Sequence, residues 1–312
     1  MTNELIVSPK SIWVKEIEYF IKYKAQSLSN AELFGSWKTE EATFAKIRDE
    51  YYVLSDIDIS TNSNNEFISF EQDVRNSFFA PSLDISNIML LKSRAQKIQR
   101  QINLGQHKIM VIEKTELSES ISIRIFYSML DLWQGILNSD FIWISYSLIR
   151  FLAEIPLFYC WSIGEIHPSY TNRLNVANTK TNIKQNPYYD LICYAVKAKT
   201  SIIEFKETNN IKDQYDFFNK TIKCYKSTIL SLLSREDPSN LLLLKIQDSI
   251  DFEFKLNYVE IENTWKLYYD SIDDGKNRYR YLTNRVRSII SQNRNNTHYY
   301  SKLNCDKKPV LD

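Results

Sequence analysis

Leu33-Phe34-Gly35-Ser36-Trp37 and Ser55-Asp56-Ile57-Asp58-Ile59 are the two stretches that decide the expected fold. Successive side chains in a β-strand point to opposite faces, so Asp56 and Asp58 share one face while the isoleucines point into a core. Two neighbouring carboxylates repel each other. A divalent cation between them removes that cost, because hard cations such as Mg²⁺ take oxygen ligands. Gly35 lets the backbone approach a phosphate closely, and Ser36 adds a hydroxyl donor. Together the stretches predict a site for a metal ion and a phosphate.

A strand ending in Gly-Ser, followed by a strand carrying Asp-x-Asp, resembles the DNA polymerase β-like nucleotidyltransferase superfamily. The resemblance implies that Gly35 and Ser36 bind the triphosphate of a nucleotide, with ATP as the expected NTP. It also implies that Asp56 and Asp58 are catalytic residues that bind Mg²⁺ or Mn²⁺. The alternative is a surface Asp-x-Asp next to an unrelated turn.

The spacing between the two stretches differs from that of the superfamily. Asp56 lies 20 residues after Ser36, whereas the loop usual in the family is short. Residues 38–52 are rich in helix formers, which predicts a small inserted helix. The resemblance covers about the first 125 residues and is specific only over the two quoted stretches.

A third carboxylate is the next expectation, because the superfamily usually adds an acid on a later strand that binds a second metal ion. Two stretches read as strands, 108–115 and 121–126. The first contains Glu113, and the second has Arg124 where an acid is expected. We predict Glu113 as the third catalytic residue, with a solvated glutamate as the alternative.

Composition places the chain among ordinary globular proteins. It has 312 residues, 44% hydrophobic and 25% charged, with a net charge of +1, so the global charge favours neither nucleic acid nor a membrane surface. Only 5 glycines and 7 prolines are present, which favours helices. The 4 cysteines and 3 histidines are scattered along the chain, so a zinc site is not expected. The N-terminus lacks the pattern of a signal peptide, so we expect a cytoplasmic protein.

The order of elements predicts an α+β fold. A small mixed β-sheet, the nucleotidyltransferase core with helices on one face, is followed by a mostly α-helical C-terminal domain. We expect a nucleotidyltransferase domain over 1–126, a helical domain over 127–303 and a disordered tail over 304–312. The elements expected in the first domain are helices at 9–24 and 88–102 and strands at 32–37, 54–60, 67–74, 108–115 and 121–126.

The helical half is expected to break at several prolines and asparagines. These lie at Pro156, around His167-Pro168, at Asn186-Pro187, around Asn209-Asn210 and at Asp237-Pro238. The architecture of a sheet followed by helices resembles the antibiotic nucleotidyltransferases, although no motif in residues 127–312 supports that likeness.

Residues 141–164 are apolar and almost long enough to span a bilayer. They contain Arg150 and Glu154 at i, i+4 spacing, and Pro156. Charges at the centre of a bilayer are costly. We therefore predict a buried helix with an internal ion pair and no membrane association.

Residues 276–308 combine arginines and lysines with tyrosines, a composition that suits phosphate contact and base stacking. The preferred alternative is a basic helix that packs against the acidic segment before it.

These features predict a metal-dependent nucleotidyltransferase that moves a nucleoside monophosphate from an NTP to an acceptor hydroxyl and releases pyrophosphate. The acceptor could be a small molecule, a protein or an RNA. The alternative is a catalytically weak nucleotide-binding regulatory protein or a toxin–antitoxin component. The sequence leaves the acceptor, the preferred NTP and the oligomeric state open.

Overall fold

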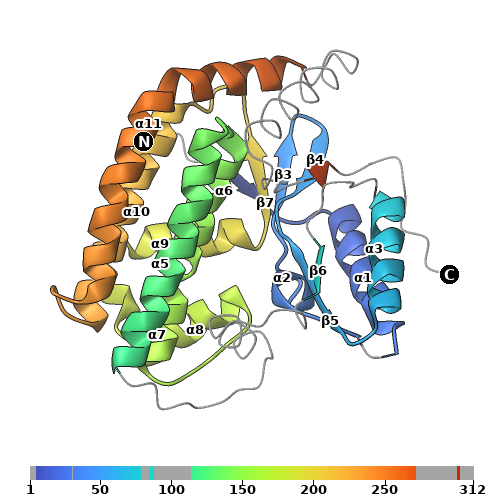
Figure 1. The fold of residues 1–312 in the computed structure, drawn as a ribbon, viewed down its shortest axis with the longest axis horizontal. Coiled ribbons are helices and arrows are strands. Elements are labelled where there is room, and N and C mark those ends of the chain that lie inside the picture. Colours follow the sequence, from blue (N-terminus) through green and yellow to red (C-terminus); the bar gives the residue numbers. More distant parts are fainter. Residues whose placement is uncertain (1–4, 30, 79–84, 88–113, 272–300, 303–312) are drawn as a thin grey trace.

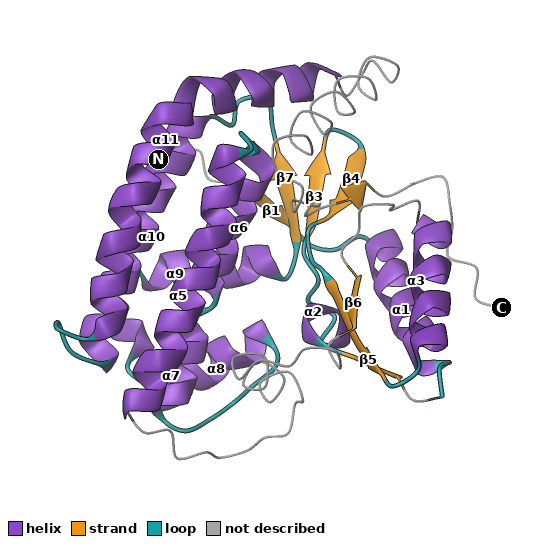
Figure 2. Ribbon diagram, viewed as in Figure 1, coloured by secondary structure: helices purple, strands orange, loops and turns teal. Residues whose placement is uncertain are grey.

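The computed structural model describes residues 5–29, 31–78, 85–87, 114–271 and 301–302. The chain has an α+β fold, with a small mixed sheet region followed by a helical C-terminal region. The strands lie in the middle of the molecule, with the long helices of the C-terminal region on one side and two N-terminal helices on the other (Figures 1 and 2).

The larger sheet combines strands from distant parts of the chain. Its order is β1 (Ile6–Ser8), β7 (Ile202–Phe205), β3 (Phe44–Ile47), β4 (Glu50–Val53) and β8 (Ser301–Lys302). Strands β3 and β7 are parallel, and the other neighbours are antiparallel. Strand β7 was not expected, because the C-terminal half reads as helical throughout. Its β-branched pair Ile202-Ile203 is the signal that could have revealed it.

The smaller sheet carries the two stretches that predict the site. Its order is β2 (Ala31–Leu33), β5 (Ile57–Thr61) and β6 (Ile85–Asn87). Along β5, Ile57 and Ile59 are buried and Asp58 is half-buried, while Asp56, just before the strand, is exposed. The alternation expected from the sequence is confirmed.

The N-terminal helices cover the smaller sheet. They are α1 (Ile12–Gln26), the single turn α2 (Gly35–Lys38) and α3 (Asn64–Phe78). Helix α1 confirms the helix expected over 9–24. Its first turn is capped by the Ser11 hydroxyl, which accepts a hydrogen bond from the Val14 N–H at 3.3 Å.

Apart from β7 and β8, the described elements of the C-terminal region are helices that pack mainly on each other (Figure 1). They are α5 (Lys114–Leu137), α6 (Phe141–Ala153), α7 (Ile155–Ser162), α8 (Tyr170–Lys180), the 3₁₀ turn η2 (Ile183–Gln185), α9 (Tyr189–Lys199), α10 (Ile211–Leu232) and α11 (Pro238–Ser271). The expected breaks at Pro156, Asn186-Pro187 and Asp237-Pro238 are confirmed by the ends of these elements.

The apolar stretch Phe141–Ser162 is long and apolar enough to cross a membrane, but 94% of its most apolar window is buried inside the protein. The prediction of a buried core segment is confirmed. The internal ion pair is different from the one expected, because Arg150 pairs with Asp131, and Glu154 pairs with Arg124 and Arg173.

Two hydrophobic cores lie on the two sides of the larger sheet. In the hairpin of β3 and β4, Phe44 and Val53 pack with the N-terminal helices, whereas Ala45 and Ile47 pack with the C-terminal helices. Strand β7 contributes Ile202 to the first core and Ile203 to the second. The expected domain boundary near residue 127 falls inside α5, which continues without a break to Leu137.

The helix predicted for residues 38–52 is wrong, because the hairpin of β3 and β4 occupies most of this insertion. Aromatic and β-branched residues such as Phe44, Tyr52 and Val53 favour strands, and the hairpin buries them between the two cores. The helix formers Glu40, Glu41 and Ala42 lie in the loop before it.

The strand predicted for residues 67–74 is also wrong, because this stretch belongs to α3. Phe70 and Val74 are buried at helical spacing. A capping signal was missed: the Ser63 hydroxyl accepts a hydrogen bond from the Glu66 N–H at 3.2 Å, which matches the Ser-x-x-Glu pattern of a helix start.

The strand predicted for residues 121–126 is wrong as well, because this stretch lies inside α5. Its alternating isoleucines fit a strand, but Leu117, Ile121 and Ile125 are also buried at spacings of four, and this helical period continues to Ile136. The end of the strand predicted for residues 108–115 is wrong, because residues 114 and 115 begin α5, while residues 108–113 lie outside the described residues. Other expectations also lie outside the described residues: the helix over 88–102, the basic segment 276–308 apart from β8, and the tail over 304–312.

Candidate functional site

The turn at Gly35 brings the two stretches that carry the predicted site into contact. Gly35 has φ +61°, in the left-handed region that favours glycine. The Phe34 N–H donates to the Asp58 carbonyl oxygen at 2.8 Å, which ties the end of β2 to β5. A Cβ on Gly35 would lie 3.6 Å from Oδ2 of Asp58. The backbone at Gly35 and the Asp58 carboxylate therefore face the same space.

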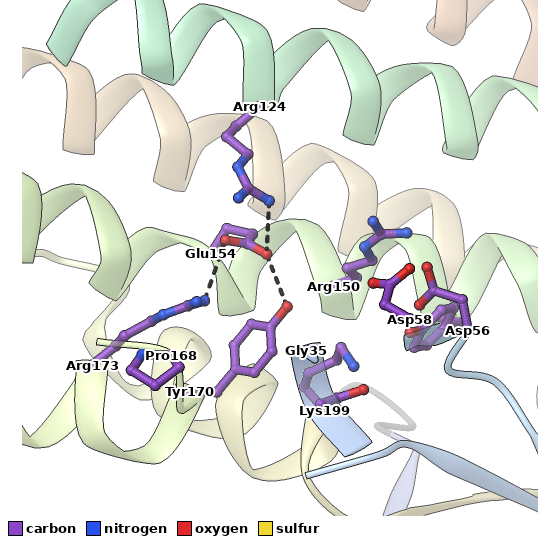
Figure 3. Close-up of a pocket in the computed structure, with 12 residues that line it drawn as sticks. Gly35, Asp56, Asp58, Arg124, Arg150, Glu154, Pro168, Tyr170, Arg173 and Lys199 are labelled. Carbon is purple, nitrogen blue, oxygen red and sulfur yellow. Dashed lines mark hydrogen bonds and ion pairs between the residues drawn. The ribbon is translucent and has the colours of Figure 1, made fainter. Parts of the chain in front are cut away.

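A single pocket contains all four of the N-terminal residues predicted for the site. Gly35, Ser36, Asp56 and Asp58 line it on the N-terminal side. Figure 3 shows the carboxylates of Asp56 and Asp58 close together beside Arg150. The third expected acid, Glu113, lies outside the described residues.

The other wall of the pocket comes from the C-terminal helices and is rich in positive charge. It is lined by Arg124 of α5, Arg150 of α6, Arg173 of α8 and Lys199 of α9 (Figure 3). None of these four residues was predicted from the sequence to belong to the site. Arg124 and Arg150 each lie in an apolar stretch of sequence. Because a buried charge is costly without a partner, this placement was the signal that could have revealed them.

Glu154 holds two of these arginines in place. Its Oε1 accepts a hydrogen bond from the Tyr170 hydroxyl at 2.9 Å and lies 3.5 Å from Nη1 of Arg124. Its Oε2 lies 3.6 Å from Nη1 of Arg173. Burial raises the pKa of Glu154. The charges of the nearby arginines and the hydrogen bond from Tyr170 together outweigh burial, so the pKa lies below its ordinary value. Glu154 is therefore an anion that fixes the far end of the pocket.

Lys199 brings a buried positive charge to the pocket. Its ammonium donates to Oγ1 of Thr43 at 2.9 Å and to Oγ of Ser55 at 3.3 Å, and it lies 5.1 Å from the ring centroid of Tyr170. Among the described residues, no carboxylate forms an ion pair with Lys199. A buried charge is costly without a partner, so an anion bound in this pocket would compensate it.

Arg150 lies near the two aspartates and pairs with an acid from α5. Its Nη1 is 3.1 Å from Oδ2 of Asp131. Burial raises the pKa of Asp131 above its ordinary value, Arg150 opposes that rise, and the negative charge of Asp56 adds to it. The negative charge of Asp56 therefore acts on both the Asp131 carboxylate and the Arg150 guanidinium.

Glu41 joins the Gly35-Ser36 turn to the wall formed by α8. Its carboxylate accepts hydrogen bonds from the Ser169 hydroxyl at 2.7 Å and from the Tyr170 and Thr171 N–H groups at 2.7 and 3.0 Å. Its own N–H donates to the Ser36 carbonyl oxygen at 2.7 Å. One glutamate therefore sets the first turn of α8 against the Gly35-Ser36 corner.

The two aspartates have the chemistry of a divalent-cation site. They offer hard oxygen ligands next to each other at the start of β5. Both line a pocket whose other wall carries positively charged side chains. In the described part of the chain, no group of three or more His, Cys, Asp and Glu residues is arranged to hold a metal ion. Two carboxylates are nevertheless donors of the kind that Mg²⁺ binds together with water and substrate oxygens.

No protein-family model matches the chain, and neither a curated protein nor a solved structure is significantly similar to it.

Proposed function

We propose that the chain is a metal-dependent nucleotidyltransferase that moves a nucleoside monophosphate from an NTP, with ATP first among the candidates, to an acceptor hydroxyl. The observation that carries this proposal is the pocket in which Gly35, Ser36, Asp56 and Asp58 face cationic side chains of the C-terminal helices. A triphosphate needs positive charge around it, and a divalent cation needs oxygen ligands. This pocket offers both within one space.

Each part of the pocket has a role in this reaction. Asp56 and Asp58 would hold Mg²⁺ or Mn²⁺, which when bound neutralises phosphate charge and aligns the phosphates for displacement. The Gly35 backbone and the Ser36 hydroxyl would bind phosphate oxygens, and Lys199 would place its buried charge against the same polyphosphate. Phosphoryl-type transfer depends mainly on positioning and charge stabilisation, which is what these groups supply.

The acceptor hydroxyl must lie in line with the α-phosphate, about 3–3.5 Å from it. Ligand sites often lie between domains, and this pocket lies between the N-terminal strands and the C-terminal helices (Figure 3). A small molecule, a protein side chain or an RNA end are all acceptors with a suitable hydroxyl.

The test is to incubate the protein with each labelled NTP and Mg²⁺ or Mn²⁺, with and without candidate acceptors, and to measure pyrophosphate release. We expect release that depends on the metal and is lost in Asp56→Asn. Nucleotide binding without pyrophosphate release under any condition would instead favour the alternative, a catalytically weak nucleotide-binding regulatory protein or toxin–antitoxin component.

A further inference from the structure

One face of α11 exposes a row of large apolar side chains. The helix lies along the outer edge of the C-terminal region (Figure 1), and its inward face packs on α5 and α10. Along its outward face, six large apolar side chains are between 39% and 68% exposed: Leu241, Leu244, Phe252, Leu256, Val259 and Leu267.

Single exposed apolar residues are ordinary on a protein surface, but these six recur on one side of a helix. The three most exposed, Phe252, Leu256 and Val259, follow each other at spacings of four and three, so they are neighbours on the helix surface. At a rise of 1.5 Å per residue, the face from Leu241 to Leu267 is about 39 Å long. An apolar face of this length with charged edges is typical of a site for protein–protein contact.

The charged side chains on the two edges of this face indicate what covers it. With about 100° between successive residues around the helix axis, exposed Lys245 and Glu260 lie on one edge, and exposed Asp248 and Lys255 lie on the other. Within the described residues, Lys245 and Asp248 form no ion pair, while Lys255 pairs with Asp251 one turn before it. On each edge the charge therefore changes sign between the N-terminal and the C-terminal half of the helix.

This change of sign favours an antiparallel pairing of two copies of α11. In a parallel pair each charge would face its own copy, and like charges would repel. In an antiparallel pair with the two-fold axis at Phe252, residues at nearly equal distances before and after Phe252 meet on the same edge. Lys245 then lies beside Glu260 of the partner subunit, and Asp248 lies beside Lys255 of the partner subunit. Opposite charges at such edge positions set the orientation of paired helices.

We propose that the outward face of α11 is the interface of a two-fold symmetric homodimer, in which the two helices pack antiparallel about Phe252. This inference goes beyond the proposed function and does not depend on it. A two-fold interface must be self-complementary, and a face that carries both signs of charge on each edge meets that condition. One helix face buries less than the roughly 800 Å² per partner of a standard interface, so we expect a dissociation constant in the micromolar range.

The first experiment is sedimentation velocity of the full-length protein over a series of micromolar concentrations. The wild type should change from a monomer of 36.9 kDa to a dimer as the concentration rises. Phe252→Asp should raise the dissociation constant of the dimer at least roughly tenfold, because it removes a central apolar contact from both copies. The matched control is Tyr19, which is 57% exposed on α1, on the other side of the strands (Figure 1). Tyr19→Asp should leave the dissociation constant unchanged.

Charge reversals test the antiparallel arrangement in the same assay. Asp248→Lys and Lys255→Glu should each weaken the dimer roughly threefold or more, because each brings like charges together at two symmetry-related positions. The double variant should recover the dissociation constant of the wild type, because opposite charges meet again. In a parallel pair, none of the three changes would alter the number of like-charge contacts. All the altered side chains are exposed, so every variant should fold, which circular dichroism melts check.

A wild type that stays monomeric over the whole concentration series would overturn the inference. A dimer that Phe252→Asp does not weaken, or that Tyr19→Asp weakens equally, would place the interface elsewhere and overturn it as well. Single charge reversals without effect would overturn the antiparallel arrangement. None of these results bears on pyrophosphate release, so the proposed function is tested separately.

Discussion

Asp56 lies just before β5 and Asp58 lies within it, and both carboxylates are negatively charged. In the proposed function they bind the metal ion. Asp56→Asn and Asp58→Asn should each lower nucleotide transfer by more than about 10²-fold, the usual effect of removing one charge-stabilising group. Neither change should destabilise the protein, because removing one of two neighbouring like charges relieves repulsion. Pyrophosphate release and thermal melting measure the two effects.

The control for these variants is Asp73→Asn, which changes a half-exposed carboxylate on α3 outside the pocket. It should leave transfer unchanged. Full activity in the double variant of Asp56 and Asp58 would contradict the metal assignment.

Gly35 is a second residue whose role can be separated from its effect on stability. Its φ of +61° makes any side chain strained, so Gly35→Ala should cost about 1–2 kcal/mol in the free energy of unfolding. The added Cβ would also stand 3.6 Å from Oδ2 of Asp58, in the space proposed for a phosphate. Affinity for an α,β-methylene NTP, an analogue that cannot react, should therefore fall at least roughly tenfold, equivalent to 1.4 kcal/mol. Denaturant unfolding and calorimetric titration measure the two quantities.

Gly164 offers a matched control because it also has a positive φ, of 74°, but lies outside the pocket. Gly164→Ala should lower the free energy of unfolding by about as much as Gly35→Ala does, and it should keep the nucleotide affinity of the wild type. If both variants bind the analogue equally well, Gly35 is only a turn residue.

At the scale of an element, α8 depends on a carboxylate from the other half of the molecule. The hydrogen bonds that Glu41 accepts at the start of α8 lower its pKa, although burial alone would raise it. Glu41→Gln should cost about 2 kcal/mol at pH 7, because a buried ionised acceptor is lost. Since the folded-state pKa is depressed, this stabilisation exists above the ordinary value of 4.5 and is lost as the pH falls through the folded-state pKa.

Urea unfolding of the wild type and Glu41→Gln between pH 7 and pH 3 tests this prediction. The difference in unfolding free energy should shrink toward the acid end. The neighbouring exposed Glu40, which pairs with Lys22 at the surface, supplies the control, and Glu40→Gln should cost at most about 1 kcal/mol. A difference for Glu41→Gln that stays constant over this range would show that its charge does not stabilise α8.

At the scale of the whole molecule, β7 joins the two halves of the chain. It lies between β1 and β3 in the larger sheet, so the N-terminal strands are bridged by a strand from residues 202–205. A fragment of residues 1–126 would lack this strand and expose one side of the hairpin. We expect it to be unfolded, whereas the full chain should unfold in one cooperative transition.

Circular dichroism and proton NMR of the fragment, beside calorimetry of the full chain, measure these outcomes. A fragment with a dispersed spectrum and a cooperative melt would show that the N-terminal half is an independent domain, as the sequence alone suggested.

The sequence by itself determined the local features of this protein. The alternation around Asp56 and Asp58, the helix over α1 and the breaks at Pro156 and Asp237-Pro238 follow from side-chain periodicity and backbone chemistry within a few residues. The same local signals gave a wrong prediction in α5, where the isoleucines of residues 121–126 fit both the period of a strand and the period of a helix.

The tertiary structure alone decided how the pocket is completed. Arg150 and Lys199 reach the Asp-x-Asp stretch from helices far along the chain, and β7 enters the sheet between strands that precede it by more than 150 residues. Such contacts form because the apolar faces of the helices and strands must be buried together. The local sequence pattern around a residue does not indicate which distant residue it will contact in the fold.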